Sequence, residues 1–247
     1  MKKTCIALLL LISAFIAGCD AGKETVKNEE VSQKSLRGGM TYGGSISINS
    51  TENYTSLFPL EVTDAYSNLI VNNVYEGLMR INKENLAVEE CLAEKMTVND
   101  SSDEFTFVLR DDVFFHDDPC FEEGKGRKMT AEDVEYCLTM ACTKMENNRQ
   151  ADFLIQKIKG AADFYNGKSD KVSGISINGN NKVTIKLVKS FAAFDKLLAH
   201  SGFCIFPVEA YEKYGADMKE HMVGTGPFQQ GGLDNGVQVT LKKNPNY

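Results

Sequence analysis

The stretch that decides the fold lies between residues 75 and 134 and contains YEGLMRI (75–81), CLAEK (91–95), EFTFVLRDDVFFHDD (104–118) and MTAEDV (129–134). Phe105, Phe107 and Leu109 alternate with less apolar residues, which is the period of a half-buried strand. Thr130 then precedes a helical pattern with Asp133 at its third position, which is close to a capping box. The stretch therefore predicts a strand, a charged turn and a capped helix in that order.

Hydrophobic periodicity and turn residues predict the elements around this stretch. We expect strands at 43–48, 78–81, 172–177, 183–187 and 237–241. We expect helices from a cap at Thr63 or Asp64 to about residue 76, and at 130–145, 151–165, 191–200 and 207–215, with a helical turn at 86–94. GTGPF at 224–228 favours a tight backbone crossing. Strands and helices mix without regular βαβ alternation, which indicates an α/β to α+β chain.

Composition excludes several classes of function. The chain has 247 residues, 43% of them hydrophobic and 25% charged, with a formal net charge of −7. This is globular composition, long enough for one large domain or two small ones, and the acidic balance argues against nucleic-acid binding. The sequence contains no G-x-x-x-x-G-K-[ST], no G-x-G-x-x-G after a strand and no H-E-x-x-H.

The amino terminus has the pattern of an export signal. Lys2 and Lys3 precede an apolar run that ends in small residues, so residues 1–18 are predicted to be a signal peptide. Ile16-Ala17-Gly18-Cys19 resembles the bacterial lipobox, which predicts lipidation of Cys19. Residues 19–38 are polar and lack periodicity, and are expected to form a flexible tether.

The residues able to carry chemistry form no convincing catalytic or metal site. The tightest cluster is His116, Asp117, Asp118 and Cys120, but its spacing is too short for one tetrahedral site without a second ligand pair. A surface turn is therefore favoured, and no catalytic residue, metal or cofactor is predicted. Isolated His200 and His221 favour capping or packing, and the pair Glu132 and Asp133 favours helix-start charge over acid/base work. Buried free thiols are favoured and disulfides left open for Cys91, Cys120, Cys137, Cys142 and Cys204.

Seven ordered motifs resemble one family, the large solute-binding proteins of ABC importers in the peptide/nickel-binding class, family 5. They are SLFP (56–59), NNVYEGLMRI (72–81), LAEK (92–95), EFTFVLRDDVFFHDD (104–118), MTAEDV (129–134), GTGPF (224–228) and LKKNPNY (241–247). The departures are Asp112 and Asp118 in place of glycine, an insertion at 119–128, Phe58 in place of aspartate, and the loss of the proline before and the tryptophan after LAE. These departures bear on local loop shape rather than on the family.

The resemblance implies a fold and a domain plan. Family members are similar to a periplasmic-binding-protein type II clamshell, of which this chain is expected to hold an incomplete α/β part. Residues 39–74 and 189–247 would form segments of the first lobe, and 75–188 an inserted small α/β subdomain. The second lobe would come from later sequence, so the chain is expected to be truncated or a fragment.

The resemblance also implies a function without catalysis. The expected activity is capture of short peptides by an exported, lipid-anchored receptor that delivers them to ABC permease subunits. The segment Thr63, Asp64, Ala65 and Tyr66 stands where the family lines its ligand cleft. The alternatives are a nickel-chelate, haem or oligosaccharide receptor on the same scaffold, a structural or regulatory lipoprotein without transport, and, last, an exported hydrolase.

Overall fold

The computed structural model describes residues 43–234 and 238–247. Two units, Met1–Asn49 and Ser50–Tyr247, are distinguished by their internal contacts. In the described part of the first unit, residues 43–49 form neither helix nor strand, so the strand predicted at 43–48 is wrong. The alternating isoleucines are exposed, Ile46 by 86% and Ile48 by 70%. An alternating pattern becomes a strand only where a neighbour pairs with its backbone.

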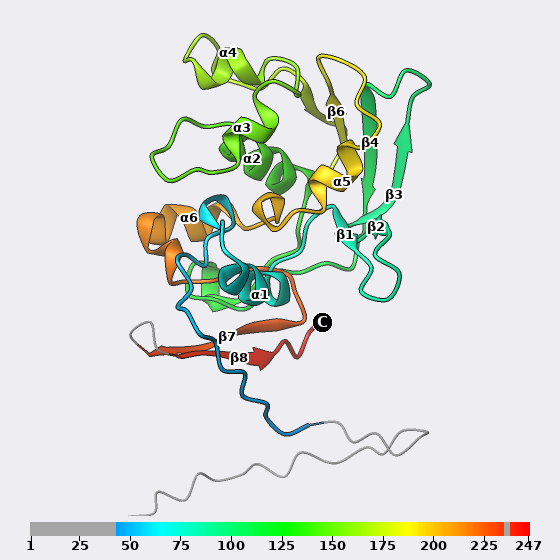
Figure 1. Ribbon diagram of the computed structural model, residues 1–247. Helices are drawn as coiled ribbons and strands as arrows, with labels where there is room; N and C mark the ends of the chain where they lie inside the picture. Colours follow the sequence, from blue (N-terminus) through cyan, green and yellow to red (C-terminus); the bar gives the residue numbers. More distant parts are fainter. Residues whose placement is uncertain (1–42, 235–237) are drawn as a thin grey trace, which may run out of the picture. The chain divides into compact units, whose positions relative to one another are not determined.

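The second unit contains a four-stranded antiparallel sheet, whose strands β3 and β4 are drawn at the right of Figure 1. Its strand order is β3 (Ala93–Val98), β4 (Glu104–Leu109), β6 (Lys182–Lys186) and β5 (Ile175–Ile177). Register pairs Phe105 with Ile185 and Phe107 with Val183, so four buried apolar side chains share one face. Since side chains alternate between the faces of a strand, the predicted period of β4 is confirmed.

Helices cover the apolar face of this sheet. The α2 helix packs against β5 and β6. The α5 helix lies near β4 (Figure 1), and the ring centroid of its Phe194 lies 5.2 Å from that of Phe105 on β4. The helices between residues 131 and 198 are α2 (Ala131–Ala141), α3 (Ala151–Leu154), α4 (Ala161–Tyr165) and α5 (Phe194–Leu198).

The α1 helix (Ala65–Val74) packs against β7 and against the 3-10 turn at Ser201–Phe203. The remaining elements are β1 (Met79–Ile81), β2 (Val88–Glu90), α6 (Val208–Tyr214), β7 (Phe228–Asp234), β8 (Gln238–Lys243) and the 3-10 turns Pro59–Glu61, Glu122–Gly124, Ser201–Phe203 and Gly215–Lys219. There are also two antiparallel hairpins, β1–β2 and β7–β8; β2 contacts β3 of the larger sheet, and β7 contacts α1. The fold is thus the mixed α/β type that the sequence predicts.

Two element predictions are wrong for reasons of tertiary pairing. The helical turn expected at 86–94 is instead β2 and the start of β3, because β2 pairs in register with β1. The helix expected at 151–165 is broken into α3 and α4, because the N–H of Lys159 donates to the carbonyl of Lys186 at 2.9 Å. Gly160, with φ +78°, then starts α4 in the left-handed region. The strand β7 was not expected at all.

Candidate functional site

The predicted ligand segment lies at the start of α1. Thr63 and Ala65 are exposed, while Asp64 and Tyr66 are half-buried. The Tyr66 hydroxyl lies 2.7 Å from the hydroxyl of Thr51. The structure therefore presents the segment at the surface as one continuous turn, and its role in binding stays a prediction.

Asp64 fixes the shape of this turn as the helix N-cap. Its Oδ1 accepts from the N–H of Ser67 at 2.7 Å, and its Oδ2 accepts from the hydroxyls of Ser67 at 2.6 Å and Thr55 at 2.5 Å. Burial alone would raise the pKa of Asp64, but these hydrogen bonds lower it to about 2. Since both carboxylate oxygens are engaged, Asp64 positions the backbone, and Thr63 and Ala65 offer the accessible surface.

The glycines of GTGPF make the tight crossing that the sequence predicts, against the other end of α1. The N–H of Gly226 donates to the carbonyl of Val74 at 2.9 Å. A Cβ on Gly226 would lie 2.7 Å from that oxygen, and one on Gly224 would overlap it. Only glycine allows this approach of two backbones.

His116 ties the loop after β4 to this crossing. It is 3% exposed, and its Nε2 lies 2.9 Å from the carbonyl oxygen of Gly226. Its Nδ1 accepts from the N–H of Gly224 at 3.3 Å. The surface turn predicted for the cluster at 116–120 is therefore wrong for His116, because the chain crosses over it from a position 110 residues later.

Glu76 joins three of the signature motifs in one buried cluster. Its Oε2 accepts from the hydroxyl of Thr225 at 2.9 Å, and its Oε1 accepts from the hydroxyl of Tyr247 at 2.8 Å. The thiol of Cys91 lies 3.5 Å from Oε1. Glu76 is only 9% exposed, so these donors replace the water that a carboxylate needs. The motifs YEG, GTGPF and NPNY are held together here.

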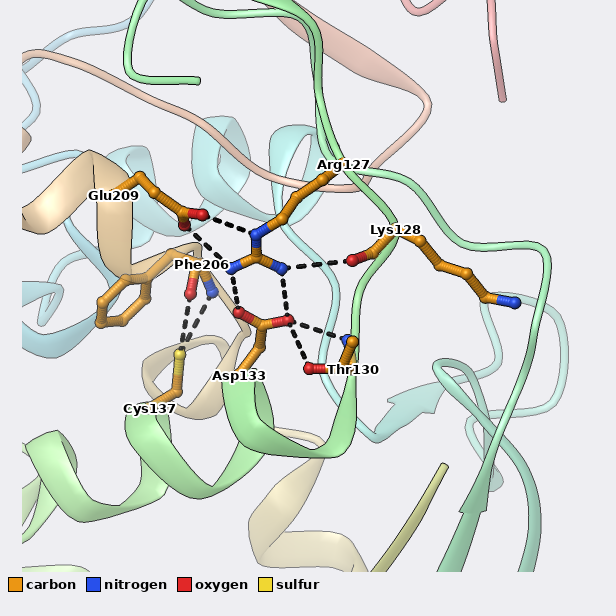
Figure 2. A network of polar contacts seen from close by, with 7 residues as sticks. All are labelled: Arg127, Lys128, Thr130, Asp133, Cys137, Phe206 and Glu209. Atoms are coloured by element: carbon orange, nitrogen blue, oxygen red, sulfur yellow. Dashed lines mark hydrogen bonds and ion pairs between the residues drawn. The ribbon is translucent and has the colours of Figure 1, made fainter. Parts of the chain in front are cut away.

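A second polar network anchors the insertion at 119–128 (Figure 2). The guanidinium of Arg127 donates to both carboxylate oxygens of Asp133 at 2.7 and 2.8 Å and to both oxygens of Glu209 at 2.6 and 2.8 Å. Asp133 Oδ2 also accepts from the N–H of Thr130 at 2.8 Å. Asp133 is thus a helix cap held by an arginine, as the sequence favours over an acid/base role.

The other polar candidates have structural partners. Asp118 Oδ2 lies 2.9 Å from Nε2 of His221, and its Oδ1 accepts from the hydroxyl of Tyr214 at 2.7 Å and from the N–H of Cys120 at 2.8 Å. Burial would raise the pKa of Asp118, but these partners lower it to about 2. His200 accepts from the N–H of Gly202 at 3.1 Å and so caps a 3-10 turn, as predicted.

Metal and thiol chemistry find little support in the described residues. Across 43–234 and 238–247, no three histidine, cysteine, aspartate or glutamate side chains are arranged to hold a metal ion. The five cysteines that the structure describes are free thiols, as favoured from the sequence. Burial raises the pKa of Cys91 and of Cys142 to about 12, which keeps both thiols protonated and unreactive.

An open surface groove of about 500 Å³ lies along β2, β3 and the turn after β4. Its walls mix two arginines with four carboxylates, namely Arg80, Arg110, Glu90, Glu94, Asp111 and Asp112. Arg80 is paired with Glu89 and Arg110 with Asp112. The groove therefore does not select for one charge, and it is separate from the segment at 63–66.

Sequence reasoning missed the residues that shape the candidate site. Thr55 and Ser67 donate hydrogen bonds to Asp64. The spacing of Asp64 and Ser67 is that of an N-cap and its third helical residue, so the local sequence contained a signal for this contact. The pairing of His116 with Gly226 had no local signal, because it depends on how distant segments cross.

Comparison with known proteins agrees with this architecture. The sequence model of bacterial extracellular solute-binding proteins, family 5 (middle region), matches residues 87–247. The glutathione-binding protein GsiB of Salmonella paratyphi A is 30% identical over 195 residues, which are 79% of this chain and 33% of that protein. The chain thus spans about a third of the length of this relative.

Solved structures show the same fold. A periplasmic oligopeptide-binding protein, OppAIV of Borrelia burgdorferi, matches with a TM-score of 0.71 and 24% identity over 79% of this chain and 38% of that one. The binding protein MoaA of A. tumefaciens R10, in complex with mannopinic acid, matches with a TM-score of 0.64 and 26% identity over 79% of this chain and 36% of that one. The described fold corresponds to part of their type II clamshell.

These matches settle the class of the protein. The described residues include no helix with the length and apolar character needed to cross a bilayer. Members of the family are extracytoplasmic and bind solutes rather than catalyse reactions. The chain therefore belongs to family 5 of the bacterial extracellular solute-binding proteins, which serve ABC importers.

Proposed function

We propose that this protein binds short peptides through the segment Thr63–Tyr66 and presents them to the permease subunits of an ABC importer. The observation that carries the proposal is the membership in family 5 together with the exposed, capped turn at the start of α1. The oligopeptide-binding and glutathione-binding names of two relatives support peptides as the solute.

The geometry of the turn suits recognition of a peptide backbone. The N–H groups of Ala65 and Tyr66 have no hydrogen-bond partner among the described residues, as expected for the first turn of a helix. A peptide carbonyl or carboxylate accepts from such groups and is favoured by the positive end of the helix dipole. Exposed Thr63 and Ala65 would then contact the peptide side chains loosely, which permits varied sequences.

Isothermal titration of the full-length protein with a di-, tri- and pentapeptide series tests this proposal. We expect heat of binding with at least one length, and weaker binding in Ala65→Trp, which places a bulky ring on the exposed turn. Ala192→Trp is the matched control, since Ala192 is also exposed but lies in the turn before α5. No heat with any peptide, or equal loss in both variants, would contradict the assignment.

The anchoring proposal concerns Cys19, which lies outside the described residues, as do the predicted signal peptide and the whole of the predicted tether. We infer from the lipobox pattern that Cys19 carries acyl chains that hold the receptor at the outer face of a membrane. Metabolic labelling with a fatty acid should mark the wild type and not Cys19→Ala, which should leave the membrane fraction. An unlabelled wild type would overturn the anchor without touching the peptide proposal.

A second candidate solute is a small polar conjugate rather than a peptide. The binding protein MoaA, which is 26% identical and similar in fold, was solved in complex with mannopinic acid, so a protein of this fold accepts such a compound. Heat with such a compound, and none with the peptides, would favour this alternative. The division into first-lobe segments at 39–74 and 189–247 and a subdomain at 75–188 stays part of the proposal.

A further inference from the structure

A buried glutamine holds the chain just before the proposed ligand segment. Gln150 is 1% exposed, and its Nε2 donates to the carbonyl of Val62 at 3.3 Å and to that of Pro59 at 3.5 Å. The backbone N–H of Arg149 donates to the carbonyl of Leu60 at 2.9 Å. Two consecutive residues therefore hold three carbonyls of the turn that leads into α1.

The orientation of the Gln150 amide is fixed by these carbonyls. Turning the amide by half a rotation would place Oε1 against the oxygens of Pro59 and Val62, and only the NH₂ group can donate to them. Oε1 has no hydrogen-bond partner in the described structure, which is unusual for a buried acceptor. Gly202 packs directly against the amide, because a Cβ at this position would overlap the Gln150 side chain.

The carbonyls that Gln150 holds lie only a few residues before the proposed ligand segment. Val62 is extended, with φ −67° and ψ 126°, and only Thr63 separates it from the N-cap Asp64. The turn that packs on Gln150 also contacts α1, because the Ser201 hydroxyl hydrogen-bonds to Oδ1 of Asn68. Asn68 Nδ2 in turn donates to the carbonyl of Asp64 at 2.8 Å.

We propose that Gln150 is a positioning residue for solute binding, which sets where the backbone of residues 63–66 lies. The inference rests on the proposed function, since it assumes that this segment contacts the solute. Gln150 belongs to segment 75–188, so the part of the chain expected to be an inserted subdomain fixes the ligand segment of the first lobe. The grip acts through Val62 and the first turn of α1, and Gln150 itself need not touch the solute.

Hydrogen exchange measured residue by residue, together with peptide titration, tests the role of Gln150. The reporters are the amides of Glu61, Ser67 and Asn68, whose acceptors all lie in or beside the gripped turn. The variants are Gln150→Met, which removes the donor and the unpartnered acceptor together, and Gln150→Glu. The matched control is Gln156→Met, because Gln156 is exposed in the turn after α3.

We expect Gln150→Met to lower the unfolding temperature modestly, because the carbonyls of Pro59 and Val62 lose their donor while the unpartnered Oε1 is removed as well. Exchange at the three reporter amides should rise about tenfold, and peptide Kd should weaken about fivefold, as for one or two lost hydrogen bonds. At neutral pH, Gln150→Glu should raise amide exchange and peptide Kd further than Gln150→Met does, because a carboxylate then faces two carbonyls. In acid both quantities should return toward the wild-type values, because the protonated carboxyl donates a hydrogen bond again.

The outcomes separate the inference from the proposed function. Wild-type exchange at the reporter amides in both Gln150 variants would overturn the grip, and raised exchange with unchanged peptide affinity would overturn its role in binding. Faster exchange throughout β4 and β6 as well would show general destabilisation and also count against it. A wild type that binds no peptide contradicts the proposed function, while the exchange data still decide whether Gln150 holds the turn.

Discussion

Nε2 of His116 lies 2.9 Å from the carbonyl oxygen of Gly226, a contact between two signature motifs that are 110 residues apart in the chain. The carbonyl can only accept, so Nε2 carries the proton, and Nδ1 accepts from the N–H of Gly224. The neutral ring is therefore the form that holds the GTGPF loop. A second proton on Nδ1 would oppose the Gly224 donor.

His116 is expected to make folding stability depend on pH. Burial lowers the pKa of His116 below its ordinary value of 6.5. The unfolded chain then binds a proton at a higher pH than the folded chain does, so the free energy of unfolding falls as the pH drops. The stabilising contribution of neutral His116 is fully present above about pH 6.5 and is lost as the pH falls through the pKa of His116 in the folded protein. Urea unfolding between pH 8 and pH 5 measures it.

His116→Gln is the variant that isolates this effect. Glutamine donates and accepts but does not titrate, so the variant should lose about 1 kcal/mol at pH 8 and show a flatter profile below pH 6.5. Profiles of equal slope for wild type and variant would contradict the role of His116.

Substitution at the backbone crossing should be far more damaging at one glycine than at another. Gly224→Ala places a methyl group on the Val74 carbonyl and should destabilise the protein by about 1–3 kcal/mol. Gly232→Ala is the control, since a Cβ there meets nothing within 4 Å. Thermal unfolding of the two variants checks the difference, and equal melting temperatures would show that the loop does not make the crossing.

The carboxylate of Glu76 should depend on its hydroxyl donors. Thr225→Val keeps the shape of the side chain but removes the 2.9 Å hydrogen bond to a group that is 9% exposed. A loss of about 1–3 kcal/mol is expected for an incompletely satisfied buried carboxylate. Thr97→Val is a matched control, because Thr97 is exposed on β3. Urea unfolding at pH 7 compares the two, and a neutral Thr225→Val would rule out a structural role for the cluster.

Arg127 should matter more than an exposed arginine with a similar ion pair. Arg127→Ala leaves Asp133, whose side chain is 3% exposed, without its two guanidinium hydrogen bonds. Because Arg127 is itself 35% exposed, we expect a loss of about 1–3 kcal/mol rather than that of a fully buried pair. Arg80→Ala breaks a more exposed pair with Glu89 and should destabilise the protein clearly less. Equal losses of unfolding free energy in Arg127→Ala and Arg80→Ala would contradict a stabilising role for the Arg127 network drawn in Figure 2.

Local patterns predicted the elements whose determinants are close together in the chain. The alternation of β4, the β5–β6 hairpin with Gly179 at φ +64° and the Pro-to-Gly span of α6 all have the predicted type and place. The helical turn predicted at 86–94 and the single helix predicted at 151–165 are wrong. Backbone pairing with β1 in the first case, and with Lys186 in the second, outweighs a weak local preference for helix. The sequence did not predict β7, because Gly231 and Gly232 interrupt its apolar pattern. The strand forms by pairing with β8.

By itself the sequence determined the family and the order of the main elements, because these depend on motifs, periodicity and caps within a few residues. Only the tertiary structure decided that His116 is buried under Gly226, that Glu76 joins three motifs, and that Gln150 grips the turn before α1. The physical reason is that buried polar groups take their partners from wherever the fold brings donors and acceptors together, and sequence distance carries no information about that meeting.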